Sequence, residues 1–594
     1  MALLTFKSPE FTFKQKLILE ERYLSRVIWT SNFPRPTRCK ASYKVETIPR
    51  RSSKFQPSIW TNDYIQSLSS EYKEEMYREQ CKVLSEEVRM MLCKVKNEID
   101  QLEFIDVLQR LGVAYHFNNE IRNILDNIYN TQTSNLKNNL YATSLKFRLL
   151  RQHRYNISTD VFIDFQDEMC NFKKEQPIDV EAMLSMYEAS FHSFANETIL
   201  DELRDVTSKF LKEYLKNGGN HISLLISHAL ELPLHWRIPR WEAWWFINIC
   251  ERQQNQNHVL LQFAKLDFNI VQSIYQEELK YTSRWWKRTE LGEKLSFSRD
   301  RLVENFVWTM GTNFKPEFEY FRKVITKVNS FITTIDDVYD VYGTLEELEL
   351  FTHTIERWDL SAMNSLPYYM KICFLALYNF VNELAFEILK KSGYYIIPYL
   401  KKVWADLCKS YLIEAKWYHS KYTPTLGEYL ENAWISISAP VILTHAYIAI
   451  PHSFKIEDLA SLEEDSKIIY FSTMILRFAN DIGSYKREIE TGDIPKSIQC
   501  YMNESGVSEV EACDYIKSMI CTMWKKMNKE AHTSSFSQSF IDTCINHARM
   551  AMFMYEHGDG HSIQDLEIQN RITSLALQPI PFICTKNSEL NNDI

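Results

Sequence analysis

Residues 331–342 read FITTIDDVYDVY and decide the fold class of the chain. Apolar side chains in and before this stretch recur at alternating intervals of three and four residues, a spacing typical of one face of an α-helix. Gly343 follows, and Thr344 with Glu347 predicts a capping box that starts another helix. We therefore expect a long helix, buried on one side, that ends at Gly343. Its apolar positions are Ile325, Val328, Ile332, Ile335 and Tyr339.

This predicted helix also carries three carboxylates. Asp336 and Asp340 are four residues apart and share one face, whereas Asp337 lies about 100° around the helix. Like charges one turn apart are unfavourable, and burial adds a desolvation cost. A hard cation such as Mg²⁺ offsets both effects and completes its coordination with water and substrate phosphate. The alternative is a solvated acidic face, which we expect for Asp160 and Asp164 at the same spacing.

A second group of oxygen ligands follows the apolar run at 469–476. Asn480, Ser484 and Glu488 are spaced four residues apart, so an amide, a hydroxyl and a carboxylate form one stripe of a helix. This stripe is a candidate second site for a hard cation, although alone it also fits an ordinary helix surface. Two metal-binding helices that face each other predict a polyanionic substrate, and diphosphate fits.

Such a substrate also needs fixed positive charge. Arg299 and Arg301 precede Asp336 by fewer than 40 residues, and Arg477 lies one turn before Asn480. Arginine suits bidentate contact with phosphate oxygens. An exposed surface pair is the alternative for Arg299 and Arg301.

Composition points to a helical protein. The 594 residues predict two to four domains, and only 13 glycines and 17 prolines leave few breaks in long helices. No alternating strand pattern lasts for more than a few residues, so we expect an all-α fold. The net charge of −9 argues against a nucleic-acid-binding protein. The polar segment 251–257, ERQQNQN, predicts a joint between an N-terminal helical domain, residues 50–255, and a C-terminal domain, residues 256–594.

The first 49 residues differ in charge from the rest. They hold nine basic and four acidic residues, a net charge of +5. Basic leaders rich in hydroxyl side chains are typical of organelle transit peptides, so we predict a transit peptide over residues 1–49. A disordered basic tail is the alternative. No uninterrupted apolar run reaches the ~18 residues of a membrane span, so we expect no membrane-spanning helix. The twelve cysteines contain no CxxC pair, which favours reduced thiols.

These motifs resemble those of the plant class I terpene synthases, and the resemblance covers the chain from about residue 50 to 581. The residues at 336, 337 and 340 resemble the DDxxD motif of that family, those at 480, 484 and 488 its NSE/DTE motif, and 299–301 its RxR motif. Trp308 occupies the place of an aromatic residue at the pocket floor. Tyr555 to His561 resemble the active-site lid, with Asp559 and His561 in its polar positions. Arg50, Arg51 and Trp60 resemble the RR(x)8W motif typical of angiosperm b-type monoterpene synthases.

The resemblance implies two helical domains, an N-terminal barrel-like domain and a C-terminal catalytic bundle. It implies a lyase with three Mg²⁺ or Mn²⁺ ions. The implied metal ligands are Asp336, Asp337, Asp340, Asn480, Ser484 and Glu488. The residues implied to bind substrate are Arg299, Asp336, Asp340, Arg477 and Asn480. The residues implied to take part in catalysis are Asp336, Asp337, Arg299, Arg301, Trp308, Tyr555 and Asp559.

The implied reaction begins by ionisation of a prenyl diphosphate. The DxDD motif of the protonation-type cyclases is missing, because Thr334 stands where its extra aspartate would fall. Aromatic faces stabilise a carbocation without trapping it, and Trp308 is the first candidate, with Trp244, Trp245 and Tyr555 as further ones.

The resemblance also bears on the substrate. Isoprene-forming relatives carry phenylalanine at two pocket positions where this chain has Asn329 and Leu476, which favours a larger substrate. We expect geranyl diphosphate as the substrate, an acyclic monoterpene such as myrcene, ocimene or linalool as the product, a monomer, and the plastid stroma as the location. The alternatives are a sesquiterpene synthase acting on farnesyl diphosphate, a prenyl-chain-elongating synthase and a non-catalytic helical scaffold.

Overall fold

The computed structural model describes residues 50, 55–131, 139–165, 179–217, 221–253, 257–451, 455–464 and 466–582. The predicted transit peptide and Arg51 lie outside these residues. Contacts between Cα atoms group the chain from Arg50 onward into one compact unit. The described residues contain helices and no strands, which confirms the all-α prediction.

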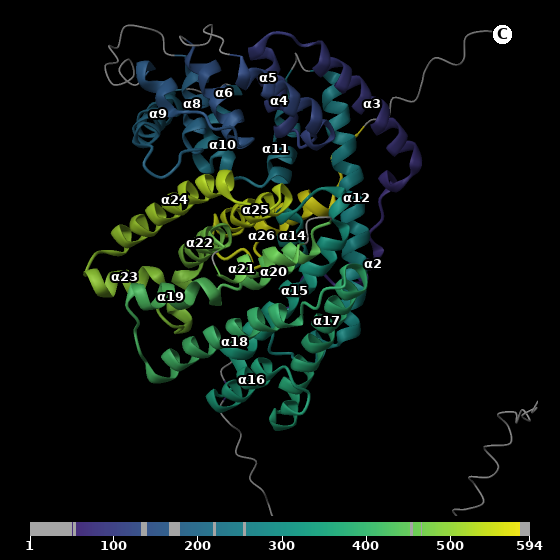
Figure 1. Cartoon of the computed structure of the whole chain (residues 1–594), viewed down its shortest axis with the longest axis vertical. Helices are drawn as coiled ribbons and strands as arrows, with labels where there is room; N and C mark the ends of the chain where they lie inside the picture. The colour runs from purple at the N-terminus through teal and green to yellow at the C-terminus, as the bar shows by residue number, and fades with distance from the viewer. Residues whose placement is uncertain are drawn as a thin grey trace, which may run out of the picture. The chain divides into compact units, whose positions relative to one another are not determined.

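One set of helices precedes the predicted joint and lies in the purple and blue part of Figure 1. Short 3₁₀ turns, such as Glu71–Lys73 and Leu234–Trp236, connect some of them. Its α-helices are α2 (Asn62–Ser67), α3 (Glu75–Lys94), α4 (Glu98–Arg110), α5 (Asn118–Asn130), α6 (Leu140–Gln152), α8 (Val180–Ser190), α9 (Thr198–Asn217), α10 (His221–Glu231) and α11 (Pro239–Glu251).

The second set follows the joint. Its α-helices are α12 (His258–Thr289), α13 (Leu291–Lys294), α14 (Leu302–Thr312), α15 (Glu319–Asp337), α16 (Leu345–Arg357), α17 (Tyr368–Ser392), α18 (Ile397–Ser420), α19 (Leu426–Ser436), α20 (Ala439–Ala449), α21 (Ile456–Glu464), α22 (Lys467–Thr491), α23 (Ser497–Ser505), α24 (Glu509–Thr533), α25 (Gln538–Tyr555) and α26 (Leu566–Ile572).

Helix α12 joins the two sets, and Figure 1 shows it running along both. Phe263 in its first half is buried in a core shared with α3, α4, α5 and α11. Tyr275 and Leu279 in its second half are buried in another core, with residues of α14 and α25. One continuous helix of 32 residues therefore contributes to the hydrophobic cores of both parts.

Helix α24 packs against the first set through aromatic and polar contacts. Trp524 stacks on Trp236 with ring centroids 5.5 Å apart. One turn further on, the side-chain amide of Asn528 donates to the backbone carbonyls of Phe191 and Ser193 at 2.9 and 3.0 Å. These carbonyls follow the end of α8, where helical hydrogen bonding stops, so Asn528 satisfies acceptors that burial would otherwise leave unpaired.

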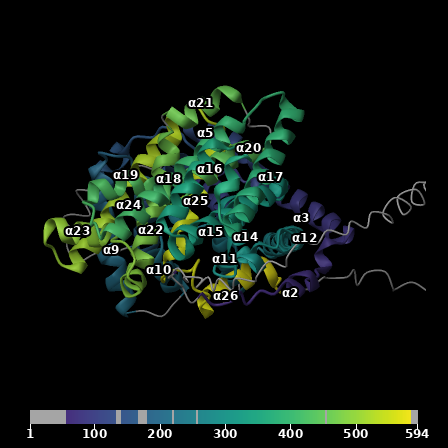
Figure 2. The same cartoon turned by 90° about the horizontal axis from the view of Figure 1, so that it is seen from below.

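Five helices form a closed ring in the second set. Helix α14 contacts α15, α15 contacts α20, α20 contacts α22, α22 contacts α25, and α25 contacts α14. Figure 2 shows α14, α15, α22 and α25 gathered within the surrounding helices. Helix α18 packs against α20 and contacts the π-helical turn Val338–Tyr342 that follows α15. Both predicted metal-binding stretches belong to ring helices, α15 and α22.

The end of α15 is fixed by Gly343. The helix continues as a π-helical turn over Val338–Tyr342, and the Gly343 backbone N–H donates to the carbonyl of Val338 at 2.8 Å. A Cβ atom on Gly343 would lie 2.5 Å from Leu348 Cδ2 and 2.9 Å from that carbonyl oxygen. Thr344 and Glu347 form the predicted capping box, which starts α16. The prediction of a helix that ends at Gly343 is therefore confirmed.

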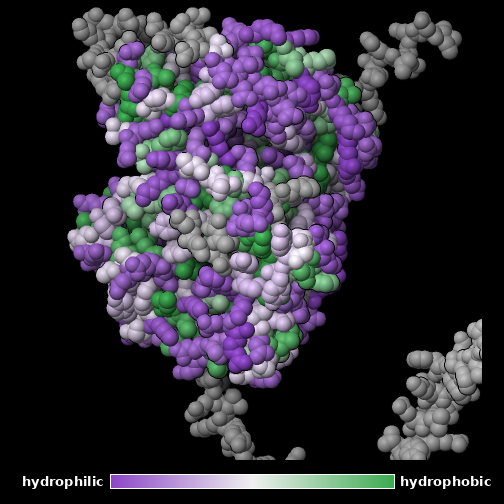
Figure 3. Space-filling model, viewed as in Figure 1, coloured by the Kyte–Doolittle hydropathy of each residue, from purple (hydrophilic) through white to green (hydrophobic). Residues whose placement is uncertain are grey.

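Among the described residues, one helix is long and apolar enough to cross a membrane by length and composition, namely α17. This helix contains no uninterrupted apolar run of about 18 residues, because a few polar residues interrupt it. Its buried side chains follow helical spacing and belong to the large hydrophobic core; they include Met370, Cys373, Phe374, Leu377 and Val381. Burial on one face is the pattern of a core helix. The face in Figure 3 is mostly hydrophilic, with hydrophobic residues in small groups.

Gly343→Ala should destabilise the protein by about 1–3 kcal/mol, because the added methyl group overlaps a backbone oxygen and a packed leucine. Gly427→Ala is the matched control, since its Cβ would meet nothing closer than Thr425 Oγ1 at 4.0 Å. Thermal unfolding of the two variants beside the wild type measures the difference. Equal melting temperatures for all three would contradict the close approach at Gly343.

Candidate active site

A cavity of about 800 Å³ lies among the ring helices. This volume is within the range of small-molecule sites, roughly 300–1,000 Å³. The structure brings most of the predicted site residues to its wall. They are Arg299, Trp308, Asp336, Asp337, Asp340, Arg477, Asn480, Glu488, Tyr555, Asp559 and His561. Arg301 and Ser484 are not among its lining residues in the described part of the chain.

The first acidic group lies where α15 passes into its π-helical turn. Asp336 is partly exposed to the cavity, with 27% of its side-chain surface accessible. Asp340 belongs to the π-helical turn itself. Burial, Asp336 and Asp493 together raise the pKa of the Asp340 carboxyl well above its ordinary value. The carboxylates that face this cavity therefore repel one another, as the sequence predicts. By contrast, Asp160 and Asp164 are exposed, as expected for a solvated acidic pair.

Asp337 is turned toward the loop that precedes α14. Its Oδ2 accepts from the backbone N–H of Arg299 at 2.6 Å and from Ser298 Oγ at 3.0 Å. The Arg299 guanidinium lies 3.0 Å from its Oδ1 and also pairs with Asp336. Asp337 is 1% exposed. Asp337 therefore holds the Arg299 guanidinium in place, so that its positive charge lies next to Asp336.

The second stripe lies on α22 as the spacing predicts. Arg477 pairs with Asp481 at 2.5 Å and also donates to the side-chain oxygen of Asn480. Asp481 is fully buried and accepts from the Tyr429 hydroxyl at 3.0 Å.

Burial raises the pKa of Glu488 to about 7, an effect that Lys496 opposes and Asp493 strengthens. Glu488 of α22 and Asp493 of the following loop therefore add carboxylate oxygens to the cavity wall on this side.

Two of the predicted site residues make other contacts. The hydroxyl of Ser484 donates to the carbonyl of Asn480 at 2.8 Å, within its own helix. The guanidinium of Arg301, 2% exposed, donates to the carbonyls of Asp300 and Ser562 at 2.9 and 3.0 Å. Arg301 thus joins two chain segments beside the cavity in this structure.

Sequence reasoning missed Lys496, which lines the cavity. Its side chain is 7% exposed, and its Nζ lies 3.5 Å from Asp493 Oδ2. Although burial opposes the charge, Asp493, Glu488 and Glu414 raise the pKa of Lys496 well above its ordinary value. Helical spacing could not identify this lysine, because α22 ends at Gly492 in a left-handed conformation and the chain turns back. Glu414 and Arg487 also line the cavity and were missed.

Aromatic side chains form another part of the wall. Trp308 packs edge-on against Tyr555 and His561, with ring centroids 6.2 and 6.4 Å apart. His561 Nε2 lies 2.9 Å from the side-chain oxygen of Asn305. Burial, with Arg299 adding to it, lowers the pKa of His561 to about 3, so the imidazole is neutral. Trp308 and Tyr555 therefore contribute aromatic surface to the wall of the main cavity.

Trp244 and Trp245 do not reach this cavity. They line a separate, smaller cavity of about 480 Å³ with residues of α10 and α11. Trp245 stacks on His228 with ring centroids 3.7 Å apart, and Trp244 stacks on Trp241 at 4.9 Å. They pack within the first set of helices, so their proposed contact with substrate is wrong.

Arg50 lies beside the end of the first acidic group. Its guanidinium donates to the carbonyl of Tyr342 at 2.7 Å, pairs with Glu347 at 2.8 Å, and lies 4.3 Å from the centre of the Tyr342 ring. Glu347 also closes the capping box of α16. Arg50 is thereby fixed to the turn that follows Asp340.

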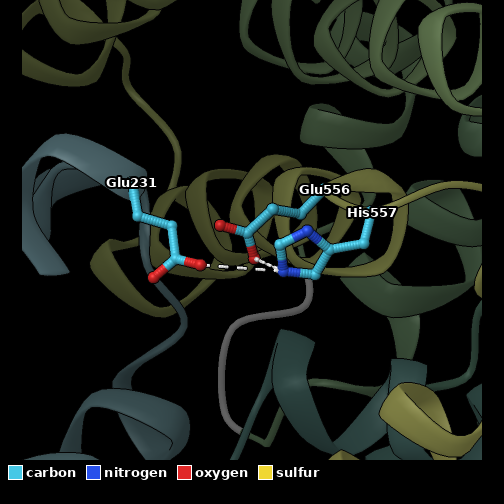
Figure 4. Close-up of side chains that lie close together, drawn as sticks. All are labelled: Glu231, Glu556 and His557. Carbon is cyan, nitrogen blue, oxygen red and sulfur yellow. Dashed lines mark ion pairs between the residues drawn. The ribbon is translucent and has the colours of Figure 1, made fainter. Parts of the chain in front are cut away.

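A third group of potential metal ligands lies apart from the cavity (Figure 4). His557 Nε2 is 3.7 Å from both Glu231 Oε1 and Glu556 Oε2. Glu556 also pairs with Arg571 at 2.9 Å, so a cation already neutralises it. Glu231 and His557 are exposed to 51% and 45%. We assign no metal to this group.

The main cavity fits divalent metal ions by the chemistry of its donors. Carboxylate, amide and hydroxyl oxygens from α15 and α22 are the hard ligands that Mg²⁺ and Mn²⁺ prefer. Arg299, Arg477 and Lys496 supply fixed positive charge beside them. A cavity that combines hard ligands, fixed cations and aromatic faces has the parts that a metal-dependent enzyme needs to act on a diphosphate ester.

Comparison with known proteins gives the family. Residues 59–230 match the N-terminal domain of the terpene synthase family, and residues 287–526 match its metal binding domain. A chloroplastic myrcene synthase of Quercus ilex is 55% identical over 556 residues, which cover 92% of this chain and 93% of that protein. The chain therefore belongs to the terpene synthase family and is a lyase that acts on phosphates.

Two solved structures share the fold. A limonene synthase with 2-fluorolinalyl diphosphate has a TM-score of 0.87 and 42% identity, covering 90% of this chain and all of that one. Isoprene synthase from grey poplar (Populus x canescens), in complex with three Mg²⁺ ions and dimethylallyl-S-thiolodiphosphate, has a TM-score of 0.81 and 42% identity, covering 88% of this chain and all of that one. The resemblance to plant class I terpene synthases and the two-domain helical architecture are confirmed.

Asp340→Asn should raise the free energy of unfolding of the metal-free protein by about 1 kcal/mol at neutral pH, because it removes a charge opposed by Asp336 and Asp493. Since the pKa of Asp340 is raised by folding, the gain should shrink as the pH falls through that raised pKa and disappear below about pH 3, where the carboxyl is protonated in both the folded and the unfolded state. Thermal unfolding across this range measures the gain.

Two comparisons control this prediction. Asp160→Asn removes an exposed carboxylate and should change nothing. Added Mg²⁺ should stabilise the wild type and the Asp160→Asn variant but stabilise Asp340→Asn much less. Equal stabilisation of all three proteins by Mg²⁺ would contradict a metal-binding role for Asp340.

Proposed function

We propose that this enzyme binds geranyl diphosphate in the main cavity, ionises it with Mg²⁺ or Mn²⁺, and releases a monoterpene and inorganic diphosphate. The observation that carries the proposal is the meeting of both oxygen-ligand groups, three buried cations and an aromatic wall around one cavity. No single part of this set identifies the reaction, but a prenyl diphosphate has the matching chemistry: a polyanionic head and an apolar tail.

The proposed metal ligands come from both helices. They are Asp336, Asp337, Asp340, Asn480, Ser484 and Glu488, and three ions are expected. Bound metal ions supply Lewis-acid stabilisation of the diphosphate as a leaving group. The Ser484 hydroxyl donates its hydrogen to the Asn480 carbonyl, which leaves its oxygen lone pairs available to a metal, whereas Asp337 already accepts from Arg299. Asp336 and Asp340 are therefore the strongest ligands to propose on the α15 side.

The chain's own cations bind and orient the diphosphate head. Arg299, Arg477 and Lys496 are each buried beside a carboxylate that keeps them charged and in place. Fixed charge of this kind stabilises negative charge as it develops, because no solvent has to reorganise. Arg301 acts in this proposal by holding the loop of Arg299 to Ser562.

The aromatic wall handles the apolar tail. Trp308 and Tyr555 offer ring faces that stabilise an allylic cation without reacting with it. The same wall excludes water, which would otherwise quench the cation. Asn329 and Leu476 also line the cavity, and neither is as bulky as phenylalanine, which favours a ten-carbon tail over a five-carbon one.

The product is the finer part of the proposal. We propose an acyclic monoterpene such as myrcene, ocimene or linalool, a product class that the similar myrcene synthase of Quercus ilex supports. The similar proteins do not share one product class, since one is a myrcene synthase and another a limonene synthase. Farnesyl diphosphate remains the alternative substrate, to be decided by the incubation described below.

The same proposal covers the setting of the enzyme. It works in the chloroplast stroma, which the chloroplastic myrcene synthase supports, after removal of a transit peptide over residues 1–49. We also propose the domain joint in the polar segment 251–257, which leads from the end of α11 to the start of α12. The enzyme is proposed to be a monomer that binds a prenyl diphosphate and no nucleic acid.

A paired incubation tests the substrate. The protein, with Mg²⁺ and either geranyl or farnesyl diphosphate, should form ten-carbon volatiles from the first far faster than fifteen-carbon ones from the second. Gas chromatography with mass spectrometry identifies the products in the same run. Preference for farnesyl diphosphate would overturn the substrate assignment, and elongated diphosphates would favour a chain-elongating enzyme.

Asp336→Ala should lower kcat/KM by about a hundredfold or more, because it removes a ligand of the proposed metal site and leaves Arg299 without one partner. Its melting temperature should stay close to that of the wild type, since Asp336 is partly exposed. Asp164→Ala is the control, as an exposed aspartate outside the cavity. Unchanged turnover in Asp336→Ala would contradict the metal assignment.

A further inference from the structure

Helix α22 presents a second functional stripe beside its metal-binding one. Gly483 and Arg487 are four residues apart and share a face, whereas Asn480, Ser484 and Glu488 lie on the neighbouring face, about 100° around the helix. The stripe of Gly483 and Arg487 meets the segment of residues 556–565, which connects α25 to α26. We call residues 556–565 the α25–α26 segment.

Gly483 allows the backbone of this segment to lie directly on α22. A Cβ atom on Gly483 would be 2.9 Å from the carbonyl oxygen of Gly558 and 3.1 Å from Tyr555 Cβ. Gly558 itself has a φ of +131°, a conformation that glycine adopts and other residues avoid. The close approach therefore depends on one glycine in each partner.

Arg487 adds a charged contact one turn further along the same stripe. Its Nη2 pairs with Oδ2 of Asp559 in the segment. Asp559 is 4% exposed at its side chain, and its Oδ1 accepts from the backbone N–H of Ser562 at 2.9 Å. Because Asp559 is buried and shapes the turn of the segment, removing its partner leaves an uncompensated buried charge.

The opposite edge of the segment is tied to the region of the first acidic group. Arg299 donates to the Ser562 hydroxyl at 2.8 Å, and Arg299 also pairs with Asp336 and Asp337. Gln564 donates to Glu304 of α14 at 2.5 Å. Asp559, His561, Ser562, Ile563 and Gln564 all line the main cavity. The segment is thus held from α14 and α15 on one edge and from α22 on the other.

We propose that Arg487 is a positioning residue that latches the α25–α26 segment to the second metal-binding helix and so keeps the cavity closed to water during the reaction. The residue next to the latch, Glu488, is a proposed metal ligand, so α22 couples the metal site to the segment. Arg487 acts through Asp559 and makes no contact with substrate in this proposal. The inference rests on the proposed function and adds a residue that its motifs do not include.

Loss of the latch should have a specific effect on turnover and on the products. A carbocation in a leaky cavity is captured by water: a C–O bond forms, a proton leaves, and the product is an alcohol. Loss of Arg487 should therefore lower kcat and shift products toward ten-carbon alcohols, while KM changes little because the cations that hold the diphosphate remain. A residue that only maintained stability would not change the ratio of alcohols to hydrocarbons.

The test compares Arg487→Gln with Lys486→Gln in the full chain. Lys486 is the matched control, because it precedes Arg487 on α22, loses the same charge, is 75% exposed and lies 3.9 Å from Glu509. With Mg²⁺ and geranyl diphosphate, Arg487→Gln should lower kcat about five- to twentyfold with KM within about twofold, and at least double the fraction of alcohols other than the main wild-type product. Lys486→Gln should match the wild type, and Arg487→Lys should recover most of the loss.

A double-mutant cycle with Asp559→Asn identifies the partner. If Arg487 acts through Asp559, the double variant should be no slower than the worse single variant, within about twofold. If the losses in kcat of the two single variants multiply in the double variant, the two residues act independently and the latch is contradicted. A raised KM together with weaker inhibition by inorganic diphosphate in Arg487→Gln would also overturn the latch, since that result assigns Arg487 to direct contact with the diphosphate.

A readout without turnover separates this inference from the proposed function. Hydrogen–deuterium exchange of the amides of residues 556–565 should be at least about threefold faster in Arg487→Gln than in Lys486→Gln and the wild type. Equal exchange in the three proteins would overturn the latch even if the enzyme turns over geranyl diphosphate. Faster exchange in a protein that makes no monoterpene would support the latch and overturn the proposed substrate.

Discussion

Repulsion among carboxylates around one buried cavity is the constraint on which the rest of this structure depends. Asp336 and Asp340 approach from α15, and Glu488 and Asp493 from the end of α22 and the loop that follows it. Such a group is unfavourable in a low-dielectric interior unless cations offset it. The protein supplies part of the offset itself, through Arg299, Arg477 and Lys496, and leaves the remainder for divalent metal ions and the substrate they bind.

Two of the arginines that line the cavity are held in position by buried aspartates. Asp337 holds Arg299 from α15, and Asp481 holds Arg477 from within α22. The ring of α14, α15, α20, α22 and α25 then fixes the two acidic helices relative to each other. Because the ring is closed, neither helix can move away from the other without breaking packing on both sides, and repulsion cannot be relieved by opening the cavity.

Excluding water is the second demand on this cavity, and segments far apart in sequence meet it together. Arg50 binds the turn after Asp340, and the α25–α26 segment lies against α22 at Gly483. Trp308 and Tyr555 supply apolar surface between these polar ties. Charged ligand groups and aromatic surface therefore share the wall of one cavity.

The sequence by itself determined the helical class, the end of α15 at Gly343, the capping box at Thr344 and both oxygen-ligand stripes. These features are local: helical spacing and turn chemistry act within a few residues. Only the tertiary structure decided that Lys496 lines the cavity, that Trp244 does not, and that Arg301 joins segments beside the cavity in this structure. Those outcomes depend on contacts across hundreds of residues, because packing, and not spacing, sets which side chains meet.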